Sequence, residues 1–193
     1  MPHDDIRYPE PKTWLLLGVA LLAAGLAFGW YAGRSVWGSE WFAENGPVEI
    51  PEAIALAVAC VIFSTRVFRS RGPVATWCIP IAYMLFHAIL RETPRCDSSY
   101  YFGGICLSHE WKYGLVALAS AVAVFLLILR RADILEMLKP RWSLVFWPLA
   151  VPVILLFLAE LFEKSRAVAV EESLELAAFG YTVVFAAWVF RKT

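Results

Sequence analysis

Long hydrophobic runs, each bounded by charged or turn-forming residues, alternate with short polar segments along this chain of 193 residues. Six such runs can be separated, and none has the polar face of a helix that packs on a soluble core. Each is near the roughly 17–25 residues that an α-helix needs to cross about 30 Å of hydrocarbon. Since the bilayer interior offers no water to unpaired backbone groups, we predict helices. The six predicted spans are approximately 14–31, 50–68, 74–90, 113–129, 144–161 and 173–190.

The composition supports a membrane protein. Hydrophobic residues make up 60% of the chain and charged residues 18%, against roughly 45–50% and about 25% in a soluble domain. Positive and negative residues balance at 17 each, so net charge argues neither for a nucleic-acid partner nor for disorder. We therefore predict an all-α polytopic helical bundle, a single transmembrane domain over residues 1–193 whose first partner is the lipid bilayer.

Positive charges are unevenly distributed over the segments between the predicted spans. Eleven of the 17 Lys and Arg residues fall on one side, and by the positive-inside rule that side faces the cytoplasm. We expect both termini in the cytoplasm and three helical hairpins that close on the outer side. The eleven residues are Arg7, Lys12, Arg66, Arg69, Arg71, Arg130, Arg131, Lys139, Arg141, Arg191 and Lys192.

Small residues in the first span indicate close helix packing. Gly25, Gly29 and Gly33 recur every four residues, a spacing that lets two helix backbones approach each other. The pattern fits packing within the bundle or a dimer interface, and we favour packing within the bundle.

Two further features bear on the shape of the predicted bundle. Pro80 in the third span, and Pro148 with Pro152 in the fifth, should kink those helices, because proline lacks an amide donor and crowds the preceding turn. The link over residues 130–142 is amphipathic, so we expect it to lie along the membrane surface.

The four cysteines divide into two pairs. Cys60 and Cys78 lie inside spans and are expected to be reduced core residues. Cys96 and Cys106 lie in the second outer loop, where an oxidising compartment would join them. Zinc is the alternative, but one pair ten positions apart is a poor zinc signature. We predict a disulfide that closes this loop, around a short hairpin over residues 100–105.

Acidic residues are concentrated on the predicted outer side. Glu49 and Glu52 are three positions apart at the start of the second span, and Glu172 and Glu175 repeat that spacing near the start of the last. Glu52 and Glu175 lie about one turn deeper, where a carboxylate needs water, a cation or a metal. Twelve of the 17 acids share this side, namely Glu40, Glu44, Glu49, Glu52, Glu92, Asp97, Glu110, Glu160, Glu163, Glu171, Glu172 and Glu175.

These acids, with two histidines, predict one polar site that faces outward at the membrane interface. Carboxylate and imidazole ligands suit a divalent metal, and without a metal the same groups could act as general acid and base. Arg91 and Lys112 are the nearby cations that could neutralise the cluster. The alternative is that these acids form no site and lie at the membrane interface only because helix N-termini favour negative charge. The candidate catalytic residues are Glu49, Glu92, Glu172, Glu175, His87 and His109; the same residues except Glu92 are the candidate metal ligands.

Known catalytic signatures do not decide the chemistry. The chain has no His-Glu-x-x-His, no Gly-x-Ser-x-Gly and no phosphate-binding loop. The segment Glu171-Glu172-x-x-Glu175 resembles the Glu-Glu motif of intramembrane CAAX-type and related glutamic proteases. Those families continue with a basic residue where this chain has Glu175 or Leu176, and their later His motif is absent, which counts against a protease.

A second resemblance covers short segments of three outer loops. The segment Glu44-Asn45-Gly46-Pro47-Val48-Glu49 is similar to a Glu-Asp-Gly-x-x-Glu segment that opens a helix in uncharacterised multi-span bacterial membrane proteins, with Asn45 in place of the usual acid. The pair Arg91-Glu92 and the Glu-Glu-x-x-Glu segment from Glu171 are also similar to those proteins. The resemblance implies a bacterial inner (plasma) membrane location and no assigned reaction.

Three functions are compatible with these features. The first is an accessory or assembly subunit whose outer acidic face docks a membrane or periplasmic protein partner, and the sequence favours it because no catalytic signature is present. The second is a membrane-embedded, metal-dependent hydrolase acting on lipid or envelope substrates. The third is a small ion- or proton-coupled transporter, which charge in the middle of the membrane would support.

Overall fold

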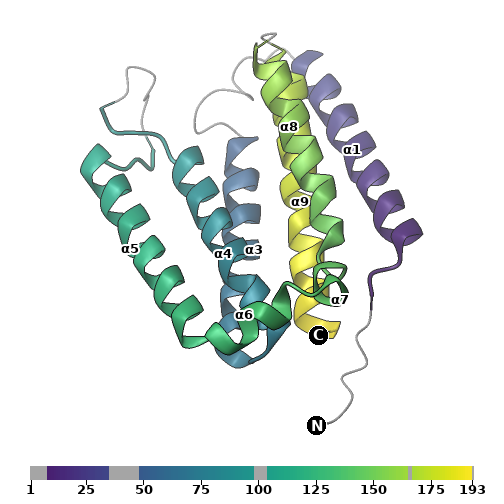
Figure 1. Ribbon diagram of the computed structural model, residues 1–193. Coiled ribbons are helices and arrows are strands. Elements are labelled where there is room, and N and C mark those ends of the chain that lie inside the picture. Colours follow the sequence, from purple (N-terminus) through teal and green to yellow (C-terminus); the bar gives the residue numbers. More distant parts are fainter. Residues whose placement is uncertain (1–7, 35–47, 98–103, 165–166, 193) are drawn as a thin grey trace.

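A computed structural model describes residues 8–34, 48–97, 104–164 and 167–192 of the chain. The described residues are almost entirely helical, and the β-structure among them is limited to one isolated bridge. The elements are α1 (Pro11–Arg34), α3 (Glu49–Arg69), α4 (Pro73–Glu92), α5 (His109–Leu129), α6 (Arg131–Met137), α7 (Pro140–Ser143), the 3-10 turn η1 (Trp147–Leu149), α8 (Ala150–Lys164) and α9 (Val168–Lys192) (Figure 1).

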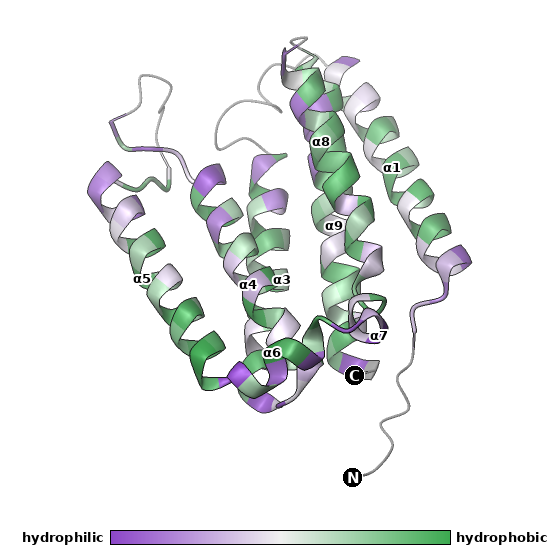
Figure 2. Cartoon of the chain, viewed as in Figure 1, coloured by the Kyte–Doolittle hydropathy of each residue, from purple (hydrophilic) through white to green (hydrophobic). Residues whose placement is uncertain are grey.

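Five of these helices are long and apolar enough to cross a membrane, namely α1, α3, α4, α5 and α9. They coincide with five of the six predicted spans. Hydrophilic residues gather at the helix ends and hydrophobic residues cover their middle portions (Figure 2), as a bilayer requires. The all-helical class and five of the six predicted apolar spans are therefore confirmed.

The predicted span over residues 144–161 differs in the structure. Its α-helix begins only at Ala150, after the 3-10 turn η1, and is 15 residues long. Pro148 lies in the 3-10 turn and Pro152 in the first turn of α8, where missing amide donors cost least. The two prolines thus delay the start of this helix. The prediction that they kink its middle was wrong.

The last helix begins earlier than predicted. Its first residue is Val168 and not Ser173, because the apolar segment Val168–Val170 contains no residue that stops a helix. The amide of Glu171 donates to the carbonyl of Ala167, 3.1 Å away. Glu172 and Glu175 therefore lie on the second and third turns of α9, whereas the predicted bounds of 173–190 had placed Glu172 at the very start of the helix.

The helices form a row in which α9 is central. Helix α9 packs against α1, α8 and α3, and α3 in turn packs against α4. Helix α5 lies at the edge of the row and contacts α4 and α6 (Figure 1). The first predicted hairpin, α1 with α3, is not a closely packed pair, because both helices pack against α9 and have little contact with each other (Figure 1).

The glycines of α1 make its contact with α9 possible. A Cβ atom added to Gly25 would come within 2.5 Å of the carbonyl oxygen of Ser173, and one added to Gly29 within 2.7 Å of the carbonyl oxygen of Ala169. The backbones of the two helices therefore touch directly. This confirms the prediction that the glycine repeat packs within the bundle.

Aromatic residues fill the core at the end of the bundle opposite the glutamates. Trp14 of α1 packs edge-on against Tyr181 and Phe185 of α9, with ring centroids 5.5 and 5.3 Å apart. Phe185 also contacts Phe63 of α3 and Phe146 ahead of α8. All of these residues are buried, so one cluster ties four parts of the chain together.

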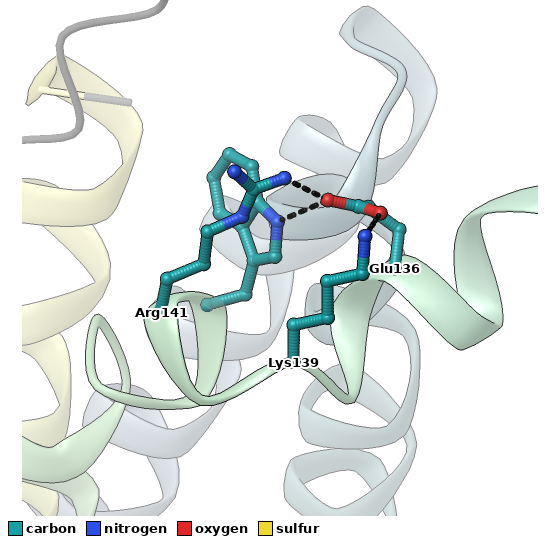
Figure 3. Close-up of polar contacts among 4 residues, drawn as sticks. Glu136, Lys139 and Arg141 are labelled. Carbon is teal, nitrogen blue, oxygen red and sulfur yellow. Dashed lines mark hydrogen bonds and ion pairs between the residues drawn. The ribbon is translucent and has the colours of Figure 1, made fainter.

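The link between α5 and α8 crosses this same end, which we call the basic end. Glu136 of α6 forms ion pairs with Lys139 and Arg141 and accepts a hydrogen bond from Trp142, 3.3 Å away (Figure 3). Nearby, Arg130 donates to the carbonyl oxygens of Val67 and Ser70 at the end of α3. The predicted amphipathic link is thus a short helical segment held by its own ion pairs.

The loop between α4 and α5 carries the predicted disulfide. Cys96 and Cys106 are joined, with Cα atoms 5.0 Å apart. Arg95 and Leu107 form the isolated bridge beside it, in which the amide of Leu107 donates to the carbonyl of Pro94 at 3.0 Å. The predicted hairpin falls mainly on residues 98–103, outside the described residues. Cys60 and Cys78 are free thiols, as expected.

Candidate functional site: a buried carboxylate cluster

Helices α3 and α9 bring three glutamates together, at the end of the bundle that we call the acidic end. Glu52 of α3 and Glu172 and Glu175 of α9 each offer a carboxylate oxygen, and these oxygens lie within 4.8 Å of one another. Glu172 and Glu175 share a helix face because they are three residues apart, and α3 packs along that face. We refer to these three residues as the carboxylate cluster.

The cluster is largely shielded from solvent. Glu52 is 0% exposed and Glu175 is 7% exposed. Neither side-chain oxygen of Glu52 accepts a hydrogen bond from a described donor. Glu172 and Glu175 lie close enough to Glu52 to act on it electrostatically. No ion pair joins a described Lys or Arg to any of the three glutamates.

Such a cluster requires positive charge or protons. Ionised carboxylates at this separation repel one another, and a buried charge without a partner costs several kcal/mol or more. Polar groups buried in a protein interior are normally satisfied. The unpartnered oxygens of Glu52 therefore point to a ligand or to bound protons.

Glu49 and Glu92 lie around the cluster and not within it. Both line a separate hollow of about 380 Å³ between α3, α4 and the disulfide loop. Glu92 is near enough to Glu52 and Glu175 to act on them electrostatically, and Glu49 acts likewise on Glu172. The Arg91 guanidinium lies 3.9 Å from the Glu92 carboxylate and is largely exposed. The four glutamates that were predicted to converge thus divide into two groups. Glu172 and Glu175 belong to the buried carboxylate cluster, and Glu49 and Glu92 lie at its rim.

The two histidines lie apart from the cluster. His87 is exposed on α4 beside the ring of Tyr83, and His109 is exposed at the first residue of α5, against Tyr113. The group of described residues with metal-ligand geometry contains neither histidine. Lys112 of α5 acts electrostatically on Glu92, so the predicted cation is at the rim and not in the centre.

An apolar hollow extends from one helical turn below the carboxylate cluster to the basic end of the bundle. Its volume is about 460 Å³, and α3, α4, α8 and α9 all contribute to its lining. The side chains that line it are overwhelmingly apolar, among them Leu56, Leu85, Phe146, Leu156 and Phe179.

Glu52 is the cluster member that the sequence prediction left out of its candidate catalytic and metal-binding residues. Its signal was present, because it lies one turn inside a helix and is followed by apolar residues. What the sequence could not show is that α3 packs on α9, which places Glu52 against Glu172 and Glu175 and away from solvent.

The donor set indicates which cation could bind. Three carboxylates without imidazole or thiolate form an oxygen-only site, which suits Mg²⁺, Mn²⁺ or Ca²⁺ better than Zn²⁺. No protein-family model, curated protein or solved structure matches this chain.

Proposed function

We propose that this protein is a membrane-embedded hydrolase that depends on a divalent cation held by Glu52, Glu172 and Glu175. The observation that carries the proposal is Glu52, which is fully buried with no described partner and faces two further carboxylates. An oxygen-rich site next to an apolar hollow is suited to a cation that polarises a substrate and activates water.

The proposal includes a membrane topology. The chain crosses the bilayer six times, with α8 as the short sixth crossing, and both termini lie in the cytoplasm of a bacterial inner membrane. The charge distribution supports this orientation, because the basic end carries α6, α7 and the pairs around Glu136, while the acidic end carries the glutamates. The carboxylate cluster then lies near the outer face.

Each residue has a distinct role in this proposal. Glu52 and Glu175 are the buried ligands, and Glu172 completes the set from the less buried side. When bound, the cation would lower the pKa of a coordinated water toward neutrality. Glu92 lies at the rim, close enough to act electrostatically on both buried ligands, and it is the candidate base that receives the proton of the water.

The test is cation binding by the purified protein. A titration with Mn²⁺ in detergent, followed by calorimetry or electron paramagnetic resonance, should give about one binding site per chain. Glu52→Gln should abolish this Mn²⁺ binding. The matched control is Glu160→Gln, because Glu160 is an exposed glutamate of α8 paired with Lys164, and this variant should bind normally. If the unaltered protein binds no Mn²⁺ or Mg²⁺ at millimolar concentration, the proposed function is wrong.

A cation- or proton-coupled transporter is the second candidate, since the same buried carboxylates could carry the coupling ion. The described hollow argues against it, because its apolar lining offers no polar path from the cluster toward the basic end. The accessory-subunit hypothesis stays a prediction, because no described contact tests a protein partner and two of the acids of its docking face, Glu40 and Glu44, lie outside the described residues.

A further inference from the structure

We infer that the substrate of this site is a membrane lipid, which enters from the bilayer between α4 and α8 and places an apolar chain in the hollow. This inference rests on the proposed function, since it supplies the substrate class for the same carboxylate cluster. Four observations carry it, namely the position of the hollow, its opening, its lining and its size.

The hollow begins one helical turn from the glutamates on three different helices. Leu56 follows Glu52 by four residues, Phe179 follows Glu175 by four, and Ala88 precedes Glu92 by four. Residues four apart lie on one face of a helix, about 5.4 Å from each other along its axis. A single molecule that fills the hollow would thus extend toward the carboxylates from the side of the basic end.

The hollow opens on the side of the bundle that faces lipid. Met84 of α4 and Val153 of α8 both line it, and they are 65% and 59% exposed. Helix α4 packs on α3 and helix α8 on α9, and the two have little contact with each other. The opening therefore lies between two helices at membrane depth, where acyl chains are the surrounding solvent.

The lining leaves no polar group for a polar ligand. The hydroxyl of Thr182 donates to the carbonyl of Ala178 at 2.8 Å, and that of Ser143 donates to Pro140 at 2.9 Å. The two indoles that line the hollow also have partners: Trp77 donates to Met137 at 2.7 Å and Trp147 to Pro9 at 3.3 Å. Every side-chain donor of the lining that the structure describes is thus satisfied by the protein, so an apolar chain is the occupant that fits.

The size fits a ligand site. About 460 Å³ lies within the roughly 300–1,000 Å³ that is typical of pockets for small molecules. A second hollow of about 170 Å³ lies between α3, α4 and α5, lined by Cys60, Ser64 and Tyr83 among others. It is smaller, and unlike the larger hollow it has no lining residue one helical turn from Glu52, Glu92 or Glu175. It serves as an internal control.

In the reaction that follows, the water oxygen bonds to the carbonyl carbon of a lipid ester or amide, and the bond from that carbon to its leaving group breaks. One proton of the water passes to Glu92 and then to the leaving oxygen or nitrogen. No oxidant or other co-reactant is required. The apolar chain stays in the hollow while the labile bond lies at the cluster.

The test uses a phospholipid with a diazirine on one acyl chain, reconstituted with the full chain in vesicles of neutral phospholipid. After illumination, peptide mass spectrometry should find the label on α4 and α8 around Met84 and Val153. Ala88→Phe fills the hollow and should lower this labelling about tenfold. Ala119→Phe, in the smaller hollow, should leave it unchanged.

A second variant distinguishes a blocked hollow from a protein that has failed to fold. Val153→Trp blocks the mouth at an exposed position and should lower labelling in the same way. Both variants should still bind Mn²⁺, since neither touches a carboxylate. Labelling spread evenly over lipid-facing helices, or unaffected by both variants, overturns the lipid inference while Mn²⁺ binding still supports the proposed function. Specific labelling without Mn²⁺ binding overturns the proposed function and leaves a lipid-binding protein. Capture of a hydrophobic peptide in place of lipid also overturns the inference.

Discussion

Helices α5 and α9 are both long enough to cross a membrane, yet they differ completely in their surroundings. Helix α5 has the most apolar stretch of the five candidate spans, and none of its residues is buried. Helix α9 is less apolar and contains three glutamates, but 61% of its most apolar stretch is buried inside the bundle. Hydropathy thus indicates contact with lipid and not position in the core.

The difference has a physical reason. A lipid-facing helix gains nothing from packing its apolar side chains, because the lipid is equally apolar. A central helix must pack through small residues and shape, and it can carry polar groups that the surrounding protein shields. Functional side chains should therefore be sought on the helix that appears less suited to the membrane.

The largest effect should come from truncating the aromatic core of α9. Phe185→Ala removes a fully buried ring that contacts Trp14, Phe63, Phe146 and Trp188, and should cost about 3–5 kcal/mol. Phe125→Ala on α5 removes a ring that is 59% exposed and should change stability by less than about 0.5 kcal/mol. Unfolding in mixed detergent measures both, and equal losses would show that α5 is packed after all.

A smaller effect should follow from adding one methyl group. Gly29→Ala pushes a Cβ into the backbone of α9 and should cost about 1–3 kcal/mol. Gly114→Ala on α5 meets no atom within 4 Å and should stabilise the helix by up to about 1 kcal/mol, because glycine is a poor helix former. Thermal unfolding of the two variants measured side by side should show a lower unfolding temperature for Gly29→Ala and an equal or higher one for Gly114→Ala.

The attachment of α5 offers a still finer test. The hydroxyls of Tyr83 on α4 and Ser120 on α5 are hydrogen-bonded at 3.0 Å. Tyr83→Phe keeps the ring and should cost about 0.6–1 kcal/mol, the usual size of such a bond in a membrane. Hydrogen exchange should show the loss in α5 and not in α9. Equal loosening of both helices would contradict a peripheral α5.

The smallest effect should be a pH dependence at the basic end. Lys139, Arg141 and Trp142 lower the pKa of Glu136 from 4.5 to about 2. Because the folded pKa is the lower one, this carboxylate contributes stability above about pH 4.5, and the contribution is lost as the pH falls toward 2. Melting curves from pH 6 to pH 3 should show the decline, and Glu136→Gln should remove that part of it.

Several features could be predicted from the sequence because each depends on local chemistry. The apolar spans follow from hydrophobic length, the Cys96–Cys106 disulfide from a short loop between spans, and the packing of Gly25 and Gly29 from their spacing. In each case the deciding residues are near neighbours in the chain. The lengths of α8 and α9 were harder, because an apolar run does not show where a 3-10 turn gives way to an α-helix.

The site depends on distant residues and could be predicted only in outline. Glu172 and Glu175 were recognised, but Glu52 joins them through the packing of α3 on α9, between residues more than 100 positions apart. His87 and His109 were expected nearby because they lie at the same depth in the membrane. Depth can be read from the sequence, whereas the order of helices around the bundle cannot.

The short length of α8 has a consequence for the bilayer itself. Its 15 residues extend about 22 Å at 1.5 Å per residue, against roughly 30 Å of hydrocarbon. The 3-10 turn at Pro148 makes up part of the difference where protein covers it. In the proposed six-span topology, the lipid leaflets next to α8 must compress to match the remainder. We therefore expect a thin, elastically strained patch of membrane beside this helix, and a protein that works best in bilayers of short-chain lipids.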